Sequence, residues 1–289
     1  MKVAVIGPVC KDLNIVRGKA HSQPGGAAYY TGEALACLGV ETVVFGTFGN
    51  EKAGWLKGFK AGLVHIPAEG TIRFVNEYPD TGTGARIQRA EIYKNEIKIK
   101  DIQPSQLAGL DYLILGPLIY HNISRPLVEE LSGYSKLILA AQGTIRYLEG
   151  ERIVWKNPDN VLGMMPFVDY IFLDDNELKF ISRRDEISRA ARFLQEKGAG
   201  KVIVTQGEQG SRIFLEDKDY KITSFPAQEV VDPTGAGDSY LAGFVKALEL
   251  FDDPSTQGEF AAMTATLSLE REGPFSGTTD SVLDRLGWK

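Results

Sequence analysis

The sequence has few of the residues that build metal centres or disulfide frameworks. Its 289 residues include only two cysteines, Cys10 and Cys37. Two cysteines give neither a disulfide framework nor the spacing of a zinc site, so a cytoplasmic location is expected. The three histidines are scattered and are interpreted as structural or surface residues: His21, His65 and His121.

Other features that the sequence lacks exclude whole classes of protein. No apolar run approaches the ~20 residues of a membrane span, and the first residues enter a strand-like run without the basic and apolar regions of a signal peptide. A net charge of -6 argues against a nucleic-acid binder or a binder of anionic membranes. Low-complexity tracts, repeats and linkers are absent, so residues 1–289 are expected to form a single domain.

Two common nucleotide-binding motifs are also missing. The P-loop pattern Gly-x-x-x-x-Gly-Lys-Ser/Thr does not occur, and Gly-x-Gly-x-x-Gly does not follow the first predicted strand. Gly82-x-Gly84 follows no buried strand and opens no helix, so it is not interpreted as a nucleotide loop. Any phosphate site must therefore be built in another way, such as at a helix N-terminus.

Short apolar runs alternate with helical patterns along most of the chain. Strands are predicted at residues 2–7, 42–46, 111–116, 136–141, 170–173 and 201–205. Helices are predicted from residue 27, over 51–61, 125–132, 176–181 and 186–197, from 235, and over 259–269. Continuous apolar strands between helices are typical of an α/β protein with a mainly parallel sheet covered on both faces.

The period of the pattern changes to two residues after position 71. Ile72, Phe74 and Asn76 alternate with their neighbours, and a second extended segment runs from 85 to about 99 beyond a glycine-rich turn. This alternation predicts a β-hairpin over 71–99, with Ile72 and Phe74 as its buried side chains.

The most informative stretch is Val230–Tyr240. A β-branched pair leads through Asp232 and a proline into Gly235-Ala236-Gly237, and a core-facing amphipathic helix begins there. Small residues leave N–H groups exposed at the N-terminus of this helix, where an anion is favoured. Asp238, in its first turn, would repel an anion, but it could accept a proton from a hydroxyl that attacks a phosphate. The alternative is an ordinary first-turn acid that complements the helix dipole.

The string Asp-Pro-Thr-Gly-Ala-Gly-Asp at 232–238, followed by Ala242-Gly243, resembles the C-terminal signature of the ribokinase/PfkB family of carbohydrate kinases. The resemblance implies a three-layer α/β/α ribokinase-like fold with a small β-lid, formed here by about 13–24 and 71–99. It implies an ATP-dependent kinase in which Asp238 is the base. The N–H groups of Gly235, Ala236 and Gly237 would hold the developing phosphate charge.

The resemblance also points to residues that bind the phosphate acceptor. Asp12 and Asn14 follow the first strand, where the family has an acid that binds substrate hydroxyls; the alternative for Asp12 is a turn residue. Gly25-Gly26 opens a small-residue helix, as in the first family signature. Tyr29-Tyr30 stands where many sugar kinases have asparagine, a variant similar to archaeal inositol-kinase-like members, and it puts ribose in doubt. Tyr30 is assigned to the substrate site, although both tyrosines could be core aromatics.

Four polar residues directly follow predicted strands and should therefore line one sheet edge: Asp12, Gln142, Asp174 and Thr205. Gln142 and Arg146 could hold a polyol or a phosphate, and a plain surface loop is the alternative. Asp174 and Glu177 lie where the family has Asn-x-x-Glu beside hydrated magnesium. Oxygen ligands suit this ion, and helix capping is a compatible alternative.

The resemblance extends to the nucleotide and to the assembly. Thr205, Gly207 and Gly210 resemble the family's Thr-x-Gly-x-x-Gly turn, which approaches the nucleotide. The loop Glu272-Gly273-Pro274 is only loosely similar to a loop near the family's monovalent-cation (K⁺) site, so no residue is assigned to such a site. Pairing of two lids would give a homodimer.

These expectations favour a kinase that phosphorylates a small sugar or polyol, with myo-inositol-like compounds or hexoses preferred to ribose. One alternative is a nucleoside kinase on the same scaffold, since Tyr29 and Tyr30 could stack on a base. The other is a catalytically silent sugar-binding sensor. An intact Asp238 argues against the silent sensor, because a pure binder has no use for a base.

Overall fold

The computed structural model describes residues 1–16, 18–51, 53–78, 87–216 and 218–288. Its larger sheet has the strand order β15-β14-β13-β12-β9-β8-β1-β4-β5. The bounds of these strands are β1 Lys2–Pro8, β4 Glu41–Gly49, β5 Gly62–Ala68, β8 Tyr112–Leu115, β9 Lys136–Ala140, β12 Tyr170–Asp174, β13 Lys201–Thr205, β14 Ser211–Leu215 and β15 Lys218–Ile222. The six strands predicted from apolar runs are confirmed as β1, β4, β8, β9, β12 and β13.

The larger sheet is mainly parallel. Strand β1 lies inside this sheet, where it pairs in parallel with β4 on one side and with β8 on the other. Strands β13, β14 and β15 pair antiparallel, so one edge of the sheet is a meander. Parallel strands end at a common edge, and the polar residues that follow β9, β12 and β13 therefore come together there.

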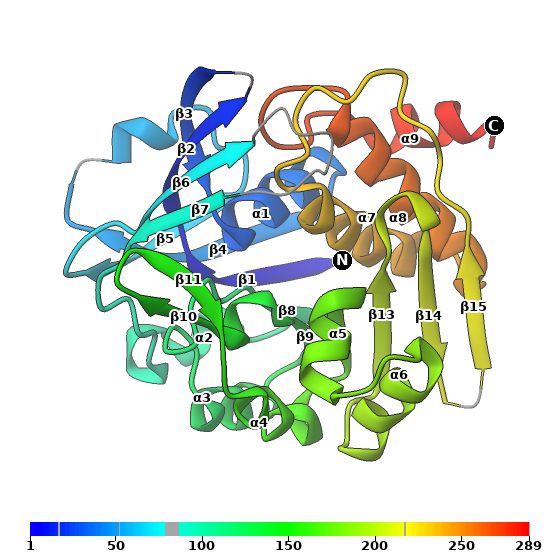
Figure 1. Ribbon diagram of the computed structural model, residues 1–289, viewed down its shortest axis with the longest axis horizontal. Coiled ribbons are helices and arrows are strands. Elements are labelled where there is room, and N and C mark those ends of the chain that lie inside the picture. Colours follow the sequence, from blue (N-terminus) through cyan, green and yellow to red (C-terminus); the bar gives the residue numbers. More distant parts are fainter. Residues whose placement is uncertain (17, 52, 79–86, 217, 289) are drawn as a thin grey trace.

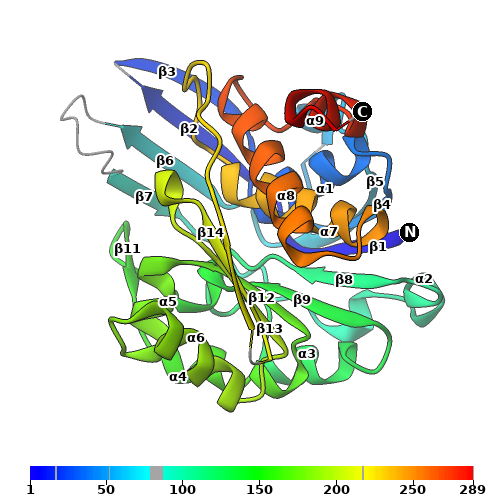
Figure 2. The ribbon, with the colours of Figure 1, turned by 90° about the vertical axis from the view of Figure 1, so that its right-hand side faces the viewer.

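Helices cover both faces of this sheet, which confirms the predicted three-layer architecture (Figures 1 and 2). Because side chains alternate along a strand, Val3 and Val5 enter one core, whereas Ala4 and Ile6 enter the other. The first core is completed by α1 Ala27–Cys37, α7 Ala236–Leu250, α8 Pro254–Leu269 and α9 Thr279–Leu286. The second is completed by α2 Pro104–Leu107, α3 Arg125–Leu131, α4 Pro158–Leu162, α5 Asp175–Ser182 and α6 Ile187–Glu196.

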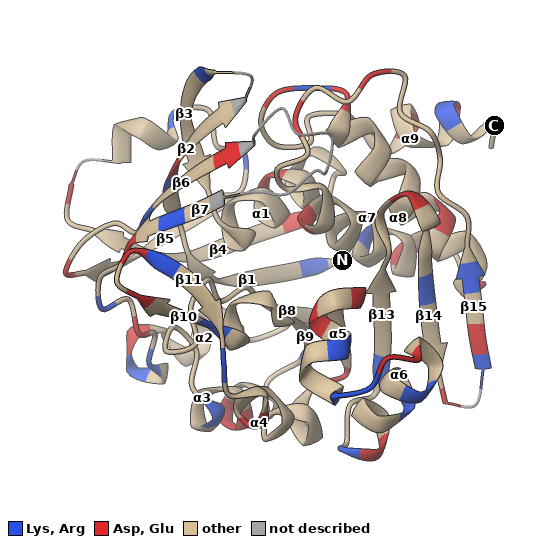
Figure 3. Cartoon of the chain, in the orientation of Figure 1, with Lys and Arg blue, Asp and Glu red and all other residues tan. Residues whose placement is uncertain are grey.

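Charged residues gather on the outer helices and at sheet edges, whereas the middle of the central strands is free of them (Figure 3). The strands of the larger sheet are apolar because helices cover both of their faces. No helix within the described ranges is long and apolar enough to span a bilayer.

A second sheet packs beside the strand ends and has the order β10-β11-β7-β6-β2-β3 (Figure 2). Its strands are β2 Cys10–Val16, β3 Lys19–Gly25, β6 Arg73–Tyr78, β7 Ile87–Glu91, β10 Arg146–Glu149 and β11 Arg152–Trp155. Ile72 and Phe74 are buried in a small apolar cluster with Cys10 and Leu118, as predicted for the two hairpin residues. This sheet confirms the small β-lid of the expected fold, and we call it the lid sheet. The predicted turn at 79–84 lies outside the described residues.

The helix predicted over residues 51–61 is wrong. The chain forms only a 3₁₀ turn, Ala53–Leu56, and then enters strand β5. Gly58 has a φ of 90°, a conformation that a right-handed helix cannot contain, so the helical pattern of Trp55 and Phe59 is interrupted. Further 3₁₀ turns span Ile99–Asp101, Ala141–Ile145, Met165–Phe167 and Gly207–Gln209.

Candidate active site

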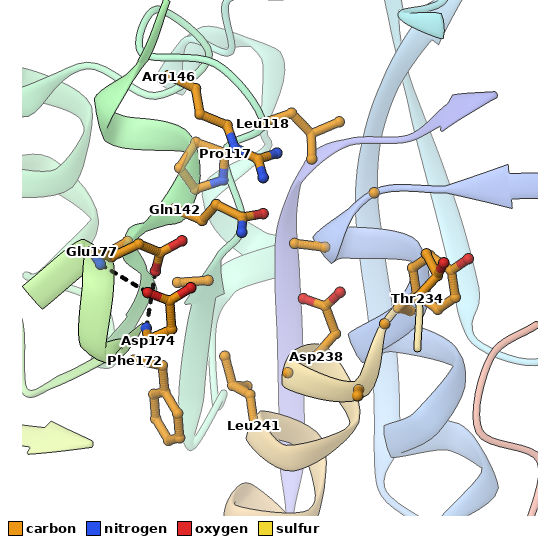
Figure 4. Close-up of a pocket in the computed structure, with 18 of the residues that line it drawn as sticks. Pro117, Leu118, Gln142, Arg146, Phe172, Asp174, Glu177, Thr234, Asp238 and Leu241 are labelled. Carbon is orange, nitrogen blue, oxygen red and sulfur yellow. Dashed lines mark hydrogen bonds between the residues drawn. The ribbon is translucent and has the colours of Figure 1, made fainter. Parts of the chain in front are cut away.

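A cavity of about 320 Å³ lies where the lid sheet meets the carboxyl ends of the central strands and the start of α7 (Figure 4). It brings together residues that are far apart in the sequence. Twelve of the residues singled out from the sequence line it: Asp12, Gly26, Tyr30, Gln142, Arg146, Asp174, Glu177, Thr205, Gly235, Ala236, Gly237 and Asp238. The cavity is therefore the candidate active site.

One wall of the cavity is the turn that opens α7. Gly235 is the N-cap of this helix and has a φ of 80°, which favours glycine over any residue with a Cβ. The N–H of Ala236 donates only a long bond of 3.4 Å to the carbonyl of Pro233. Backbone donors at this helix N-terminus face the cavity together with the positive end of the helix dipole, an arrangement that suits a phosphate group.

The carboxyl of Asp238 projects from this turn into the cavity (Figure 4). Part of its surface faces the cavity, and the surrounding protein keeps bulk water from most of it. This desolvation raises the pKa of Asp238 to about 7; the guanidinium of Arg146 lowers the pKa, whereas the carboxylate of Asp12 raises it. Asp238 is therefore poised to exchange a proton near neutral pH.

Asp12 lies within β2 of the lid sheet, and so it is not a turn residue. It is 5% exposed and accepts a hydrogen bond from the Sγ of Cys10 at 3.1 Å. Gly25 stands beside it in β3, where a Cβ would lie 2.2 Å from Oδ2 of Asp12. Gly25 does not line the cavity itself, but it leaves the space that the Asp12 carboxyl occupies.

Tyr30, which belongs to α1, also lines the cavity. Its hydroxyl accepts a hydrogen bond of 2.9 Å from Nε2 of Gln23, and burial raises its pKa well above the ordinary value. The phenol therefore stays neutral and can present its ring and hydroxyl to a bound molecule. Tyr29 packs instead against Phe59, with the two rings stacked at 5.2 Å, so one of the two adjacent tyrosines is a core aromatic.

Asp174 and Glu177 form a capping box at the start of α5 on the opposite wall. The backbone N–H of Glu177 donates to Oδ1 of Asp174 at 2.8 Å, and the N–H of Asp174 donates to Oε2 of Glu177 at 3.1 Å. Burial, and to a smaller extent the Asp174 carboxylate, raise the pKa of Glu177 to about 7. Burial also raises the pKa of Asp174. Two protonatable carboxyls this close titrate as a pair.

This carboxylate pair also fits a hard cation such as Mg²⁺. Oε1 of Glu177 is buried and has no hydrogen-bond partner of normal geometry in the described part of the chain, although Gln142 approaches this carboxyl. Carboxylate oxygens are the ligands that Mg²⁺ takes, and this ion usually keeps several waters. The described residues contain no group of three or more His, Cys, Asp or Glu side chains suited to a metal. The pair would therefore hold a hydrated ion beside phosphates rather than enclose one.

Of the three residues predicted to bind the nucleotide, the structure places one in the cavity wall and two outside it. Thr205, the last residue of β13, lines the cavity. Gly207 and Gly210 have φ values of 55° and 87° and shape the turn between β13 and β14, away from the cavity wall. A Cβ on Gly210 would lie 2.0 Å from the carbonyl oxygen of Ile222. Their glycine identity is thus explained by the turn itself.

Asn14 is also absent from the cavity wall, being 4% exposed and hydrogen-bonded within the protein. The sequence reasoning missed Phe74, Asn76 and Gln88 as cavity residues, and all three line it from the lid sheet. One signal was available for two of them. In a strand, residues two apart share a face, so Asn76 lies on the same side as the buried Phe74.

Known proteins resemble this chain over part or most of its length. Residues 151–280 match the model of the pfkB family carbohydrate kinase. The chain contains a PfkB carbohydrate kinase family domain. A nucleoside kinase of Methanocaldococcus jannaschii is 42% identical over 141 residues, which cover 47% of this chain and 45% of that relative. The matched part thus spans less than half of that relative.

Two further similarities extend over most of the chain. A cytidine kinase of Thermococcus kodakarensis is 26% identical over 259 residues, covering 85% of this chain and 87% of the relative. A solved structure described as the conversion of a pyrophosphate-dependent myo-inositol-1 kinase into a myo-inositol-3 kinase by mutation superposes with a TM-score of 0.84 at 19% identity, covering 99% of this chain and 100% of the other. At this identity the structural match shows the shared ribokinase-like fold.

Proposed function

We propose that the chain is a kinase that transfers the γ-phosphoryl group of ATP to a hydroxyl group of a small sugar or polyol. The observation that carries the proposal is Asp238, a carboxyl with a pKa of about 7 inside the cavity, directly after the glycine turn of α7. A general base works best when its pKa lies near the working pH. A carboxylate does not bind an anion, so proton transfer explains this residue where phosphate binding does not.

In the proposed reaction, Asp238 accepts the proton of the acceptor hydroxyl while that oxygen attacks the γ-phosphorus. The bond between the γ-phosphorus and the β–γ bridging oxygen breaks, and ADP leaves with the electron pair. Backbone N–H groups at Gly235–Gly237 and the guanidinium of Arg146 face the place where charge develops. Donors fixed in position before the reaction stabilise such charge strongly.

We further propose that Glu177 and Asp174 hold Mg²⁺. When bound, the ion would neutralise part of the phosphate charge. The capping box fixes both carboxyls at the start of α5, so the cation site would be organised before any ligand enters. Monovalent-cation activation and a homodimer formed through the lid sheet remain predictions. Size-exclusion chromatography with light scattering would check the second.

The cavity wall favours a polyhydroxylated acceptor, because a carboxylate and a guanidinium, from Asp12 and Arg146, line it. Such groups bind several hydroxyls at once, which suits a myo-inositol-like polyol or a hexose. A nucleoside is the second candidate. Phe74 and Tyr30 offer ring surfaces in the same cavity, and the relatives above are named as nucleoside and cytidine kinases.

The test is phosphoryl transfer by the purified protein, measured as ADP release and as phosphorylated product. Acceptors would be myo-inositol, glucose, fructose, ribose and cytidine, with ATP and, separately, pyrophosphate as donors. We expect transfer to at least one acceptor and a loss of about 10²–10⁴-fold in kcat for Asp238→Asn. A matched control is Asp280→Asn, which removes an exposed first-turn acid from α9. Equal rates for wild type and Asp238→Asn would refute the role of Asp238 as a base.

A further inference from the structure

Three amide side chains of the lid sheet are hydrogen-bonded in series and end at the phosphate-binding turn. Nε2 of Gln88 donates to Oδ1 of Asn76 at 2.7 Å, and Nδ2 of Asn76 donates to Oδ1 of Asn14 at 2.9 Å. Nδ2 of Asn14 then donates to Oγ1 of Thr234 at 3.3 Å. We call Gln88, Asn76 and Asn14 the amide relay.

The relay follows from strand register. Asn14 of β2 stands opposite Asn76 of β6, and Asn76 stands opposite Gln88 of β7. Directly opposed side chains on one face of a sheet lie within hydrogen-bonding reach. Three strands thus place three amides in a row across the lid sheet, with Asn76 and Gln88 also lining the cavity.

The relay has a fixed direction. Asn14 and Asn76 are only 4% and 1% exposed, so an unmet donor or acceptor on either would be costly. Each amide donates through nitrogen and accepts through oxygen. Turning Asn76 alone would set oxygen against oxygen and nitrogen against nitrogen. The amides therefore keep their orientation together, and the position of one constrains the next.

The far end of the relay is the turn that opens α7. Thr234 directly precedes the N-cap Gly235, and its backbone N–H donates to Oδ1 of Asp232 at 2.9 Å. The other oxygen of Asp232 accepts a bond of 3.4 Å from Nε2 of Gln23 in β3. Two strands of the lid sheet thus hold this turn through side chains.

We propose that Asn76 and Asn14 are positioning residues that couple the lid sheet to the phosphate-binding turn. An acceptor that contacts Gln88 would then fix the position of Thr234 through the relay. The backbone N–H groups of Gly235–Gly237, which follow Thr234, would be fixed with it. This inference rests on the proposed kinase function and assigns Asn14 a role behind the cavity wall. Contact with the acceptor is assigned to Gln88.

The variant Asn76→Asp tests the coupling because it is nearly isosteric. It keeps an acceptor for Gln88 but sets a carboxylate oxygen against Oδ1 of Asn14, so Asn14 must turn its amide and can no longer donate to Thr234. Asn95→Asp is the matched control: Asn95 is also 1% exposed, donates to the carbonyl of Gly70 and does not line the cavity. A loss of stability common to both variants is thereby separated from a loss of positioning.

The first readout is hydrogen exchange in the ligand-free protein. We expect peptides covering 230–238 to exchange at least about threefold faster in Asn76→Asp than in wild type, and to be unchanged in Asn95→Asp. The second readout is kinetics with ATP and either myo-inositol or cytidine. We expect Asn76→Asp to lower kcat at least about tenfold with a smaller change in KM, since the turn acts on the phosphate.

A double-variant cycle covers the case in which Asn76→Asp does not fold. Removal of either amide interrupts the same series of hydrogen bonds, so removal of the second adds nothing. The kcat of Asn14→Ala/Asn76→Ala should therefore match that of the slower single variant. Independent, multiplicative losses would overturn the relay, as would unchanged exchange at 230–238 in Asn76→Asp. Absence of phosphoryl transfer in the wild type would refute the proposed function alone, because the exchange experiment needs no activity.

Discussion

Gly235 lies against the ring of Tyr30 so closely that a Cβ atom on Gly235 would be 2.4 Å from Cδ1 of that ring. The contact joins the start of α7 to α1, and both residues line the candidate active site. Gly235 also has a φ of 80°. Two independent constraints, steric and conformational, therefore require glycine at this position.

Gly235→Ala is expected to destabilise the protein and to slow phosphoryl transfer. A non-glycine residue in this region of φ costs about 1–3 kcal/mol in the free energy of unfolding, and displacement of the Tyr30 ring adds to this. The control is Gly237→Ala, whose Cβ would meet no atom within 4 Å. Alanine is favoured over glycine in a helix by up to ~1 kcal/mol, so this control should not lower stability. Urea unfolding measures the stability of the two variants, and equal stabilities of Gly235→Ala and Gly237→Ala would contradict the argument.

The rate should depend on pH through Asp238. Its pKa is raised to about 7, and a base acts only when deprotonated. We expect kcat/KM to be low near pH 5.5 and to rise to a plateau above pH 8. Removing the charge that lowers this pKa, with Arg146→Gln, should move the rise to higher pH. Profiles from pH 5 to 9 measure it, and a rise complete by pH 5 would show an unperturbed carboxyl.

The same raised pKa predicts how stability depends on pH. The folded protein holds the Asp238 proton up to about pH 7, whereas the unfolded chain releases it near pH 4. This contribution to stability is therefore lost as pH rises from about 4 to 7. Asp238→Asn cannot ionise, so at pH 8 it should be more stable than wild type by about 1–2 kcal/mol, the shift being discounted for the solvent that reaches the cavity.

Denaturant unfolding at two pH values tests this expectation. The advantage of Asp238→Asn should vanish at pH 4. Asp280→Asn is the control and should lose a few tenths of a kcal/mol at pH 8, because it removes a charge that complements the dipole of α9. A lower stability of Asp238→Asn at pH 8 would mean that the ionised carboxyl is stabilised by its surroundings.

Glu177→Gln should raise the Mg²⁺ concentration needed for half-maximal rate by several-fold, because a hard cation loses one carboxylate ligand. Glutamine still accepts the bond from the N-cap backbone, so the capping box and the start of α5 should persist. Asp175→Asn is the control, since Asp175 lies in the same turn but pairs with Lys179 at 3.0 Å. An unchanged magnesium titration would leave Glu177 with capping alone.

The lid sheet is predicted to close over the acceptor. Amides of β6 and β7 should then exchange more slowly when the acceptor is saturating, because closure excludes water. Strand β14, the second strand from the far edge of the larger sheet, serves as the internal reference and should not change. Identical exchange in β6 and β7 with and without acceptor would describe a static wall.

The sequence predicted the central layers well and the edges poorly. Runs such as Tyr170–Leu173 are apolar throughout because both faces of the strand are covered, and this signal is strong. Strand β15 is at one edge of the sheet and β14 is next to it, and they carry charges such as Arg212 and Asp219, which pair with each other. Neither strand was predicted, because the apolar run of β14 is only three residues long and β15 has no such run.

The candidate site was predictable where one rule sufficed and was missed where two sheets must be docked. Asp174 and Thr205 follow neighbouring parallel strands, and the rule for such sheets places both at one edge. Asn76 and Gln88 reach the cavity only because the lid sheet packs at a particular place against that edge. Local pattern carries no information about this docking.

The interior place of β1 in the larger sheet has a consequence for folding kinetics. The strand is made first, yet its neighbours are β4 and β8, and the latter begins only at residue 112. The relay bond from Asn14 to Thr234 spans 220 residues. Contacts of such separation close large loops and form late. During refolding we therefore expect secondary structure to return first and phosphoryl transfer to return last, so that recovered activity reports the complete native topology.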